Sequence, residues 1–563
     1  ASYYYGNRVG FTREMDEGIA RAERARTEKN TKPWSPELKN AWYQRALDEA
    51  GGVAWFGAFA FGVQREGDRI TALLVSTPFG SGLLRASAVV DASGNADLAA
   101  AAGAPVRWIG AHHVAVQGAG LSPRQLGQYY SNTDHSFTDD NDPIGVTYAF
   151  VSARKKFADQ FDISTIVNTR ERRQIIGEIE LSPLDFLAKR TFPDTIAIAR
   201  SNFDTHGFTV HPVFLLVPPD KETLWAHVPF RCLLPRGIEG LIVTGLGMSA
   251  HRDALPVVRM QADVQNHGYA AGLACAMVAR AGFRLRDLDI RALQRRLVAL
   301  GALPEEVLTQ QDSFPLPAET VRAAAHEGPV NLYNAAVILA HAEESAPVLL
   351  DTLRNDADAE RREQAALALG LMYRPEAAMP LAEMVRSRGW DEGWNFTGMG
   401  QFGYSMSRMD ALLVALARAG VTAGGEALAA ARQAVREKAD ALDADAFFSH
   451  CRAIAVAAAV LGGETMIEAL VRLLRLPGMT GHALTDMAQA VAAVSSERNE
   501  TRSRNLALRE IYLGRALYLC GDRDHLGRNI LEQYTRDLRG PLARHAAAVL
   551  AEKDIDRLRR EIL

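Results

Sequence analysis

One stretch of the sequence joins a short apolar strand to a tight polar loop and an alanine-rich helix, which is the shape of a nucleotide-binding turn. It reads VVDASGNADLA and occupies residues 89–99. Gly94 lets the loop backbone approach a ligand closely, because any Cβ there would be in the way. Asp91 would end the strand and brace the turn, while Asp97 could cap the next helix or orient the loop. Capping by these two acids explains their presence as well as direct contact with a ligand does.

A second stretch, residues 240–282, has a similar order. A buried strand ends in Gly245 and Gly247, and a helix near residues 257–281 follows with Pro256 at its head. Proline is favoured in a first helical turn because no intrahelical donor is lost there. The free N–H groups and positive dipole end of such a helix suit an electron-rich group.

The letters GLGMSA at residues 245–250 match the G-x-G-x-x-A dinucleotide fingerprint. We discount that match because the helix does not open within the motif, as the fingerprint requires. Asp263, at roughly the spacing of a ribose ligand, is expected inside the helix and not at the end of a second strand.

The elements that must position these loops are helices and strands mixed along residues 1 to about 285. Helical periodicity fits residues 13–29 and 36–49. A hairpin turn is expected at residues 67–68. Strand-like runs occupy residues 53–64, 69–77, 83–91, 211–219, 223–231 and 240–245.

Residues from about 300 to 563 are almost entirely helical in pattern. Segments rich in leucine and alanine recur in pairs every 30 to 40 residues, which predicts an α-solenoid of the HEAT type. An irregular helical bundle is the alternative. Residues 391–410 break the pattern with glycines and aromatics, and they form either a functional loop or an ordered connection between repeats.

Composition narrows the class of protein. A chain of 563 residues is too long for one core, so two to four domains are expected. The net charge of −4 gives no electrostatic reason to expect nucleic acid or an anionic membrane as a partner, and no apolar stretch is long enough to span a bilayer. Four scattered cysteines without a C-x-x-C pair predict no metal site, and they leave a cytoplasmic or an exported location open.

Several motifs, taken in order, resemble those of FAD-dependent oxidoreductases with a glutathione-reductase-type fold. The resemblance covers roughly residues 1–285. Its motifs are YYYGN (3–7), AVVDASGNADLAAAAGAP (88–105), TRERRQIIGEIELSPLDF (169–186), SNFDTHG (201–207), VPFRCLLPRGIEGLIVTG (228–245) and GYAAGLA (268–274). It implies an α/β FAD/NAD(P)-binding fold followed by the all-α, HEAT-like domain. The expected domains are part of an FAD-binding domain (1–110), a substrate or cap region with β-strands (111–235), a C-terminal FAD-binding segment (236–285) and a helical repeat domain (300–563).

The resemblance also implies where FAD would lie. Gly94 would be near the adenosine part, with Asp91, Ala92 and Asp97 in the same turn. Gly245 and Gly247 would lie beside the ribityl-pyrophosphate. The helix start at Pro256, Val257 and Val258 would face the flavin O2/N1 edge and stabilise the negative charge of reduced flavin, with Arg259 adding its own charge.

Three features depart from the family pattern, and the largest of them is at the front of the chain. Leu246 stands where arginine is common, and His251, Arg252 and Asp253 occur where a histidine is usually followed directly by an acid. The strand–GxGxxG–helix that cradles the FAD pyrophosphate does not precede YYYGN in this sequence. We therefore expect a second polypeptide, or a cleaved N-terminal fragment, to carry that segment; a homo-oligomer is also compatible with the sequence.

Oxidation of alcohols or amines by flavin needs a base near N5, and histidine is the usual choice. His251 is the preferred candidate because it lies in the loop between the two flavin-facing elements, and His206 follows, with Asp204 orienting it. His211, His227 and the pair at residues 112–113 are further candidates. Arg170, Arg173, Arg231 and Arg252 could hold an anionic or polyhydroxylated substrate, although salt bridges to loop carboxylates would explain these arginines slightly better.

The sequence thus supports two functions. The first is an FAD-dependent oxidoreductase that transfers a hydride between a small organic substrate, of alcohol, sugar or amine type, and flavin. The second is a non-catalytic interaction protein that uses the helical-repeat domain as its working surface and retains a relic flavin fold.

Overall fold

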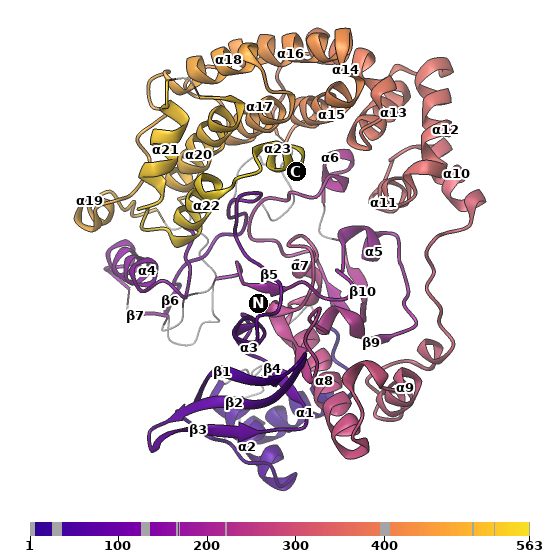
Figure 1. Cartoon of the computed structure of the whole chain (residues 1–563), viewed down its shortest axis with the longest axis vertical. Helices are drawn as coiled ribbons and strands as arrows, with labels where there is room; N and C mark the ends of the chain where they lie inside the picture. Colours follow the sequence, from indigo (N-terminus) through magenta and orange to yellow (C-terminus); the bar gives the residue numbers. More distant parts are fainter. Residues whose placement is uncertain are drawn as a thin grey trace. The chain divides into compact units, whose positions relative to one another are not determined.

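The computed structural model describes two compact units, each treated by itself below (Figure 1). The first comprises Ala1–Arg107, Arg172–Asp204 and Glu222–Phe314, and the second Trp108–Glu171, Thr205–Lys221 and Pro315–Leu563. Residues 111–235, expected to form one cap region, contribute to both. The described residues are 6–24, 36–124, 135–160, 162–164, 167, 169–219, 222–393, 406–497, 500–522 and 524–561.

The core of the first unit lies between a parallel strand pair and an antiparallel meander. Strands β4 (Val89–Asp91) and β11 (Leu241–Val243) pair in parallel, with Val243 opposite Asp91. The meander consists of β1 (Phe59–Glu66), β2 (Arg69–Thr77) and β3 (Gly80–Arg85). Its inner face packs on the parallel pair through a buried apolar cluster that includes Ile70, Leu73, Val75, Val89, Leu241 and Val243.

Several predicted elements of this unit are confirmed. The second helix, α2 (Pro36–Glu49), and the strand β2 have the expected bounds, and the hairpin turn lies at residues 67–68. Helix α1 spans Gly10–Arg24. The expected continuation to residue 29 lies outside the described residues.

Other predictions were wrong, because local contacts divide or convert the expected elements. The strand expected at 83–91 is two strands, β3 and β4. The strand expected at 211–219 is instead the short helix α6 (Val213–Leu216), whose first N–H donates to Nδ1 of His211. The helix expected at 257–281 is two helices, α7 (Leu255–Val258) and α8 (Gln261–Ala281), because Met260 between them is extended.

The remaining elements of the first unit surround this core. A strand that was not predicted, β9 (Thr195–Ser201), pairs antiparallel with β10 (Leu224–Pro229). The other elements are α3 (Asp97–Ala101), β5 (Val106–Arg107), β8 (Gln174–Ile175), α5 (Pro183–Leu187) and α9 (Ile290–Ala299).

The second unit is largely helical. Its elements before residue 300 are β6 (Pro123–Arg124), α4 (Pro143–Lys156), β7 (Asp162–Ile163) and α6. Later helices are α10 (Ala318–Glu327), α11 (Leu332–Ala340), α12 (Ala342–Asn355), α13 (Ala359–Leu371), α14 (Ala378–Ser387), α15 (Arg408–Ala423), α16 (Gly425–Asp440), α17 (Phe448–Leu461), α18 (Glu464–Leu474), α19 (Met487–Ala492), α20 (Arg502–Cys520), α21 (Leu526–Tyr534), α22 (Gly540–Ala551) and α23 (Ile555–Glu561).

These helices pack in two rows (Figure 1). In one row α13 contacts α15, α15 contacts α17, and α17 contacts α20; in the other α14 contacts α16, which contacts α18. The first row is close-packed, since a Cβ on Gly370 would lie only 2.8 Å from the carbonyl oxygen of Ala415. Of the loop at 391–410, residues 394–405 lie outside the described part. Among the described residues, no helix combines the length and apolar character needed to span a bilayer.

Candidate functional site

The loop after β4 is held by the buried carboxylate of Asp91. Its Oδ1 accepts hydrogen bonds from the backbone N–H of Ser93 at 3.0 Å and from the Ser93 hydroxyl at 2.6 Å. Its Oδ2 accepts from the N–H groups of Leu98 at 2.9 Å and Ala99 at 3.2 Å, at the start of α3. Both oxygens are engaged within the loop and helix, so Asp91 positions the turn.

A second clamp on the same loop comes from Arg173. Its backbone N–H donates to the side chain of Asn95 at 2.9 Å, its Nε to the Asn95 carbonyl at 3.0 Å, and its Nη2 to Asp97 at 2.5 Å. Asp97 therefore serves to orient the loop. Between the two clamps, Ala92 is exposed and Gly94 is half-buried with a φ of 74°.

The loop after β11 lies directly against the loop after β4. Gly245 has a φ of 73°, and a Cβ placed on it would lie 3.9 Å from Cα of Gly94. A Cβ on Gly247 would lie only 2.9 Å from the backbone nitrogen of Ala96, so this contact requires glycine. The two glycine loops thus meet at the carboxyl ends of neighbouring parallel strands, where open α/β sheets bind their ligands.

The segment around α7 is packed into the unit. Pro256, Val257 and Val258 are buried, and α7 contacts β9 and β10. Arg259 is also buried, and its Nη2 donates to the carbonyl oxygen of Asp204 at 2.5 Å. The side chains at this expected flavin edge are therefore engaged within the protein, which leaves the backbone as the part able to face a ligand.

His251 lies in the turn between β11 and α7. Its ring Nδ1 accepts a hydrogen bond from the backbone N–H of Asp253 at 3.1 Å. The backbone N–H of His251 donates to the carbonyl of Leu181 at 2.8 Å. A neutral imidazole that accepts at Nδ1 carries its proton on Nε2. In this pose Nε2–H can donate a hydrogen bond, and acceptance of a substrate proton at Nε2 requires the other tautomer. Arg252, next in the turn, is half-buried.

The other predicted site residues fall into two places. Arg231 forms a bidentate ion pair with Asp194, with contacts of 2.9 and 3.0 Å, which raises the pKa of the guanidinium. His206 and Arg170 belong to the second unit and meet at one residue: the N–H of Gly118 donates to the carbonyl of His206, and Nη1 of Arg170 donates to the carbonyl of Gly118, both at 2.8 Å. The predicted residues thus divide between the two units.

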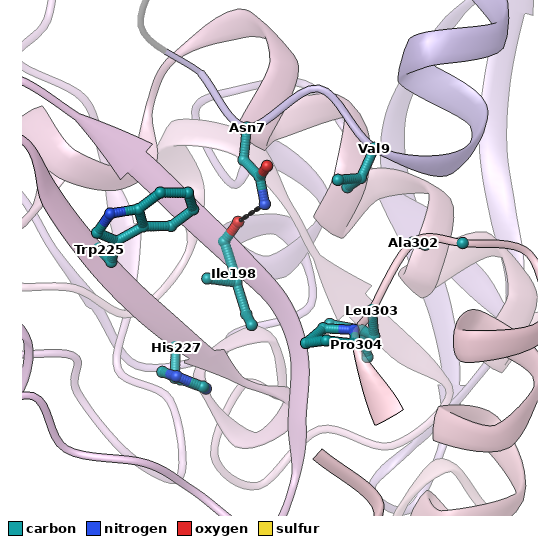
Figure 2. Close-up of a pocket in the computed structure, with 9 residues that line it drawn as sticks. Asn7, Val9, Ile198, Trp225, His227, Ala302, Leu303 and Pro304 are labelled. Atoms are coloured by element: carbon teal, nitrogen blue, oxygen red, sulfur yellow. Dashed lines mark hydrogen bonds between the residues drawn. The ribbon is translucent and has the colours of Figure 1, made fainter. Parts of the chain in front are cut away.

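A cavity of about 520 Å³ opens beside β9 and β10 in the first unit (Figure 2). Trp225 and His227 line it from β10 and Ile198 from β9, and Leu303 lies across from them. Asn7 donates from Nδ2 to the carbonyl of Ile198 at 2.8 Å. Burial lowers the pKa of His227, so its imidazole is neutral at pH 7. Sequence analysis identified His227 as a candidate residue. It did not predict the cavity, because the residues that line the cavity come from segments far apart in the chain.

The comparison with protein families agrees with this arrangement of loops. The family model described as FAD dependent oxidoreductase matches residues 7–160 and 152–297, which together make up just over half of the chain. The chain belongs to the FAD-dependent oxidoreductase family. No curated protein and no solved structure matches the sequence.

FAD is accordingly the cofactor of this FAD-dependent oxidoreductase. The glycine loops fit such a group. A Cβ on Gly94 would meet nothing within 4 Å, and Ala92 and Ser93 beside it are exposed, so the loop backbone is accessible. Asp91 and Arg173 fix that backbone in advance, which spares a ligand the cost of ordering it.

Helix α8 anchors the described end of the YYYGN motif. Asn7 donates its backbone N–H to Oδ1 of Asp263 at 2.9 Å, and Asn266 donates from Nδ2 to the carbonyl of Asn7 at 2.7 Å. Burial raises the pKa of Asp263 to about 8, against smaller opposing contributions from the N–H groups of Asn7 and Arg200. His267, one turn further along, is fully buried, and burial lowers its pKa to about 4. These two groups are therefore neutral in the native protein at pH 7.

Proposed function

We propose that this FAD-dependent oxidoreductase transfers a hydride between flavin and a small organic substrate of alcohol, sugar or amine type. The observation that carries the proposal is the contact of the Gly94 and Gly245 loops at the carboxyl ends of β4 and β11. FAD, when bound, supplies the two-electron chemistry. The chain's own residues hold the loops through Asp91 and Arg173 and manage a proton near the substrate.

In this proposal His251 is the residue that moves the proton. The backbone bond to Leu181 holds the residue in the turn. Nε2 can accept a proton from a substrate oxygen or nitrogen only when the ring proton is on Nδ1, so the imidazole gives up the Asp253 N–H contact at Nδ1 in the proposed reactive form. Arg252 in the same turn, and the donors that Arg231 retains beside Asp194, are proposed to orient the substrate. His206 remains the second proposed candidate for the base, and Arg170 remains a proposed substrate residue.

A pair of substitutions tests the role of His251. A side-chain amide cannot accept a proton, so His251→Asn and His251→Gln both remove the proposed base, and His251→Gln keeps an amide near the position of Nε2. We expect flavin reduction, followed as bleaching near 450 nm with alcohols, sugars and amines, to slow by about 10²-fold or more in both variants. Both variants should keep their flavin. Unchanged bleaching rates in His251→Asn would show that the residue has no part in proton transfer.

A polypeptide segment outside these 563 residues is proposed to complete the FAD site. The support is an apolar surface on the meander. Strand β3 exposes a leucine on each face, Leu83 at 52% and Leu84 at 40%, and Phe59, Phe61 and Phe79 are exposed by 67%, 52% and 99%. Exposed apolar surface is typical of contacts with another protein segment.

This proposal predicts the composition of the yellow protein. Flavin-loaded protein should contain polypeptide beyond the 563-residue, 61.3 kDa chain, either joined to it or as a separate fragment, and the chain expressed alone should be colourless. Intact mass, N-terminal sequencing and the visible spectrum measure this together. A 61.3 kDa chain that carries stoichiometric flavin by itself would refute the proposal.

The helical rows of the second unit are proposed to form a HEAT-like α-solenoid. The support is the regular order of contacts, in which alternate helices join one row and the helices between them join the other. Repeats that contact only their neighbours are the defining property of such arrays.

A further inference from the structure

Two buried arginines of the second unit have no acidic partner. Arg452 on α17 is 8% exposed and Arg515 on α20 is 2% exposed. Within the part of the chain that the structure describes, neither forms an ion pair with a carboxylate, and the Nε atom of each is buried without a hydrogen bond. A guanidinium cannot shed its charge, so both sites hold an uncompensated cation.

Another buried arginine in the same unit shows what compensation looks like. Arg539, also 2% exposed, contacts Asp537 at 2.6 Å, and although burial acts to lower the pKa of Arg539, Asp537 raises it. For Arg515 the result is the opposite. Burial lowers its pKa to about 10, and the positive charge of Arg452 acts in the same direction. Removing a charge from water without a counter-charge is energetically costly, which favours a bound anion at this place.

Aromatic rings cover the faces of both guanidinium groups. The guanidinium carbon of Arg452 lies 5.0 Å from the ring centre of Phe208 and 6.0 Å from that of Tyr512. The guanidinium carbon of Arg515 lies 4.8 Å from the same Tyr512 ring. Phe448 contacts the rings of Phe208 and Tyr512, and these three rings together form an aromatic wall. Stacking uses the faces of a guanidinium but not the N–H donors in its plane, and those donors are the ones that grip an oxyanion with two parallel bonds.

The neighbouring groups supply no negative charge. Nη1 of Arg515 contacts the carbonyl of His112 at 3.3 Å and Nε2 of His545 at 3.4 Å. His545 is fixed by a 2.6 Å bond between its Nδ1 and the carbonyl of Gly110, so Nδ1 carries the proton and Nε2 accepts from Arg515. The Nε atoms of Arg452 and Arg515 thus remain buried donors without a hydrogen bond.

We propose that Arg452 and Arg515, with the wall of Phe208, Phe448 and Tyr512, bind the carboxylate or phosphate group of a small molecule. The ligand's oxyanion would lie in the planes of the two guanidinium groups, and its carbon skeleton would contact the rings. The site lies wholly within the second unit and is independent of the FAD loops.

Thermal unfolding of the full-length protein tests the site with two probes, inorganic phosphate and benzoate, against chloride at constant ionic strength. We expect at least one probe to raise the midpoint in a saturable manner. Arg452→Gln should weaken that probe's apparent affinity by about tenfold or more, and Arg452→Lys, which keeps the charge but loses the planar donors, should weaken it nearly as much. Response to phosphate alone or to benzoate alone identifies which oxyanion the site prefers.

Arg432→Gln is the matched control. Arg432 lies on α16, and its Nε and Nη2 atoms both donate to the carbonyl of Leu461, at 3.2 and 2.7 Å. This variant should respond to the probes as the unmodified protein does. The unliganded stability gives a second measurement: Arg452→Gln should be at least as stable as the unmodified protein without probe, because it removes a buried uncompensated charge. The proposal is overturned if neither probe raises the midpoint, if Arg452→Gln responds like Arg432→Gln, or if Arg452→Gln is strongly destabilised without probe.

Discussion

Asp91→Asn is expected to strip most of the flavin from the protein and to destabilise it by about 2–4 kcal/mol. The four groups that Asp91 accepts from are the N–H and hydroxyl of Ser93 and the N–H groups of Leu98 and Ala99. An asparagine has one acceptor oxygen, so its amide nitrogen must face at least one backbone donor that then has no partner. Because the site is 1% exposed, water cannot replace the lost bonds.

The loss of flavin follows from the position of these donors. Ser93 sits beside Gly94, and Leu98 and Ala99 begin α3, so the loop and the helix start lose their common attachment. The backbone that must meet the cofactor would then sample many conformations, and ordering them would consume binding energy. The ratio of flavin to protein absorbance and the free energy of unfolding in urea measure the two effects.

Asp97→Asn is the control for this prediction. It makes the same chemical change on the same loop, but on an exposed side chain. Asp97 is 41% exposed and pairs with Arg173, which keeps both of its bonds to Asn95. An exposed ion pair contributes about 0–1 kcal/mol, so the variant should stay yellow. Equal flavin content and equal stability in the two variants would contradict the assigned role of Asp91.

The local pattern of the sequence predicted those elements that depend on local properties. Helix α2 and strand β2 follow from periodicity, and the turn at residues 67–68 follows from its glycine. Periodicity does not reveal which strands pair. The contact between the Gly94 and Gly245 loops could therefore be expected only from the family resemblance, which is carried by the order of the motifs.

Contacts between distant segments account for the failures. The division of the helix expected at 257–281 coincides with the buried bond between Arg259 and Asp204, which residue spacing does not reveal. The acceptor role of His251 Nδ1 depends on backbone geometry in one turn. Arg452 and Arg515 are 63 positions apart, and only the packing of α17 on α20 brings them to one tyrosine ring.

Asp263→Asn is expected to make the protein more stable at alkaline pH, and the effect should grow as the pH rises. Burial raises the pKa of Asp263 to about 8 in the native state, from its usual value of 3.8. Between these two values the native state holds a proton that the unfolded state has released. Native stability therefore falls as the pH rises through this window, by at most about 1.4 kcal/mol per pH unit, and the loss is complete above the native pKa.

Asparagine removes this proton equilibrium and keeps the packing. Oδ1 of residue 263 can still accept from the N–H groups of Asn7 at 2.9 Å and Arg200 at 3.3 Å, and the buried Oδ2 that makes no hydrogen bond becomes an amide nitrogen. At pH 5, near the lower end of this window, the variant should be more stable than the unmodified protein by at most about 1.6 kcal/mol. At pH 8.5 the variant should be more stable than the unmodified protein by about 3 kcal/mol. Relaxation of the protein around the charged carboxylate makes this difference smaller than the full pKa shift implies.

The exposed Asp48 on α2 provides the matched control. Asp48→Asn makes the same chemical change without removing a buried acid, so its unfolding midpoint should follow that of the unmodified protein from pH 5 to 8.5. Parallel pH profiles for all three proteins would mean that Asp263 ionises normally in the native state. In that case the anchoring of Asn7 on α8 would involve a carboxylate, and the N–H groups of Asn7 and Arg200 would outweigh the cost of burying its charge.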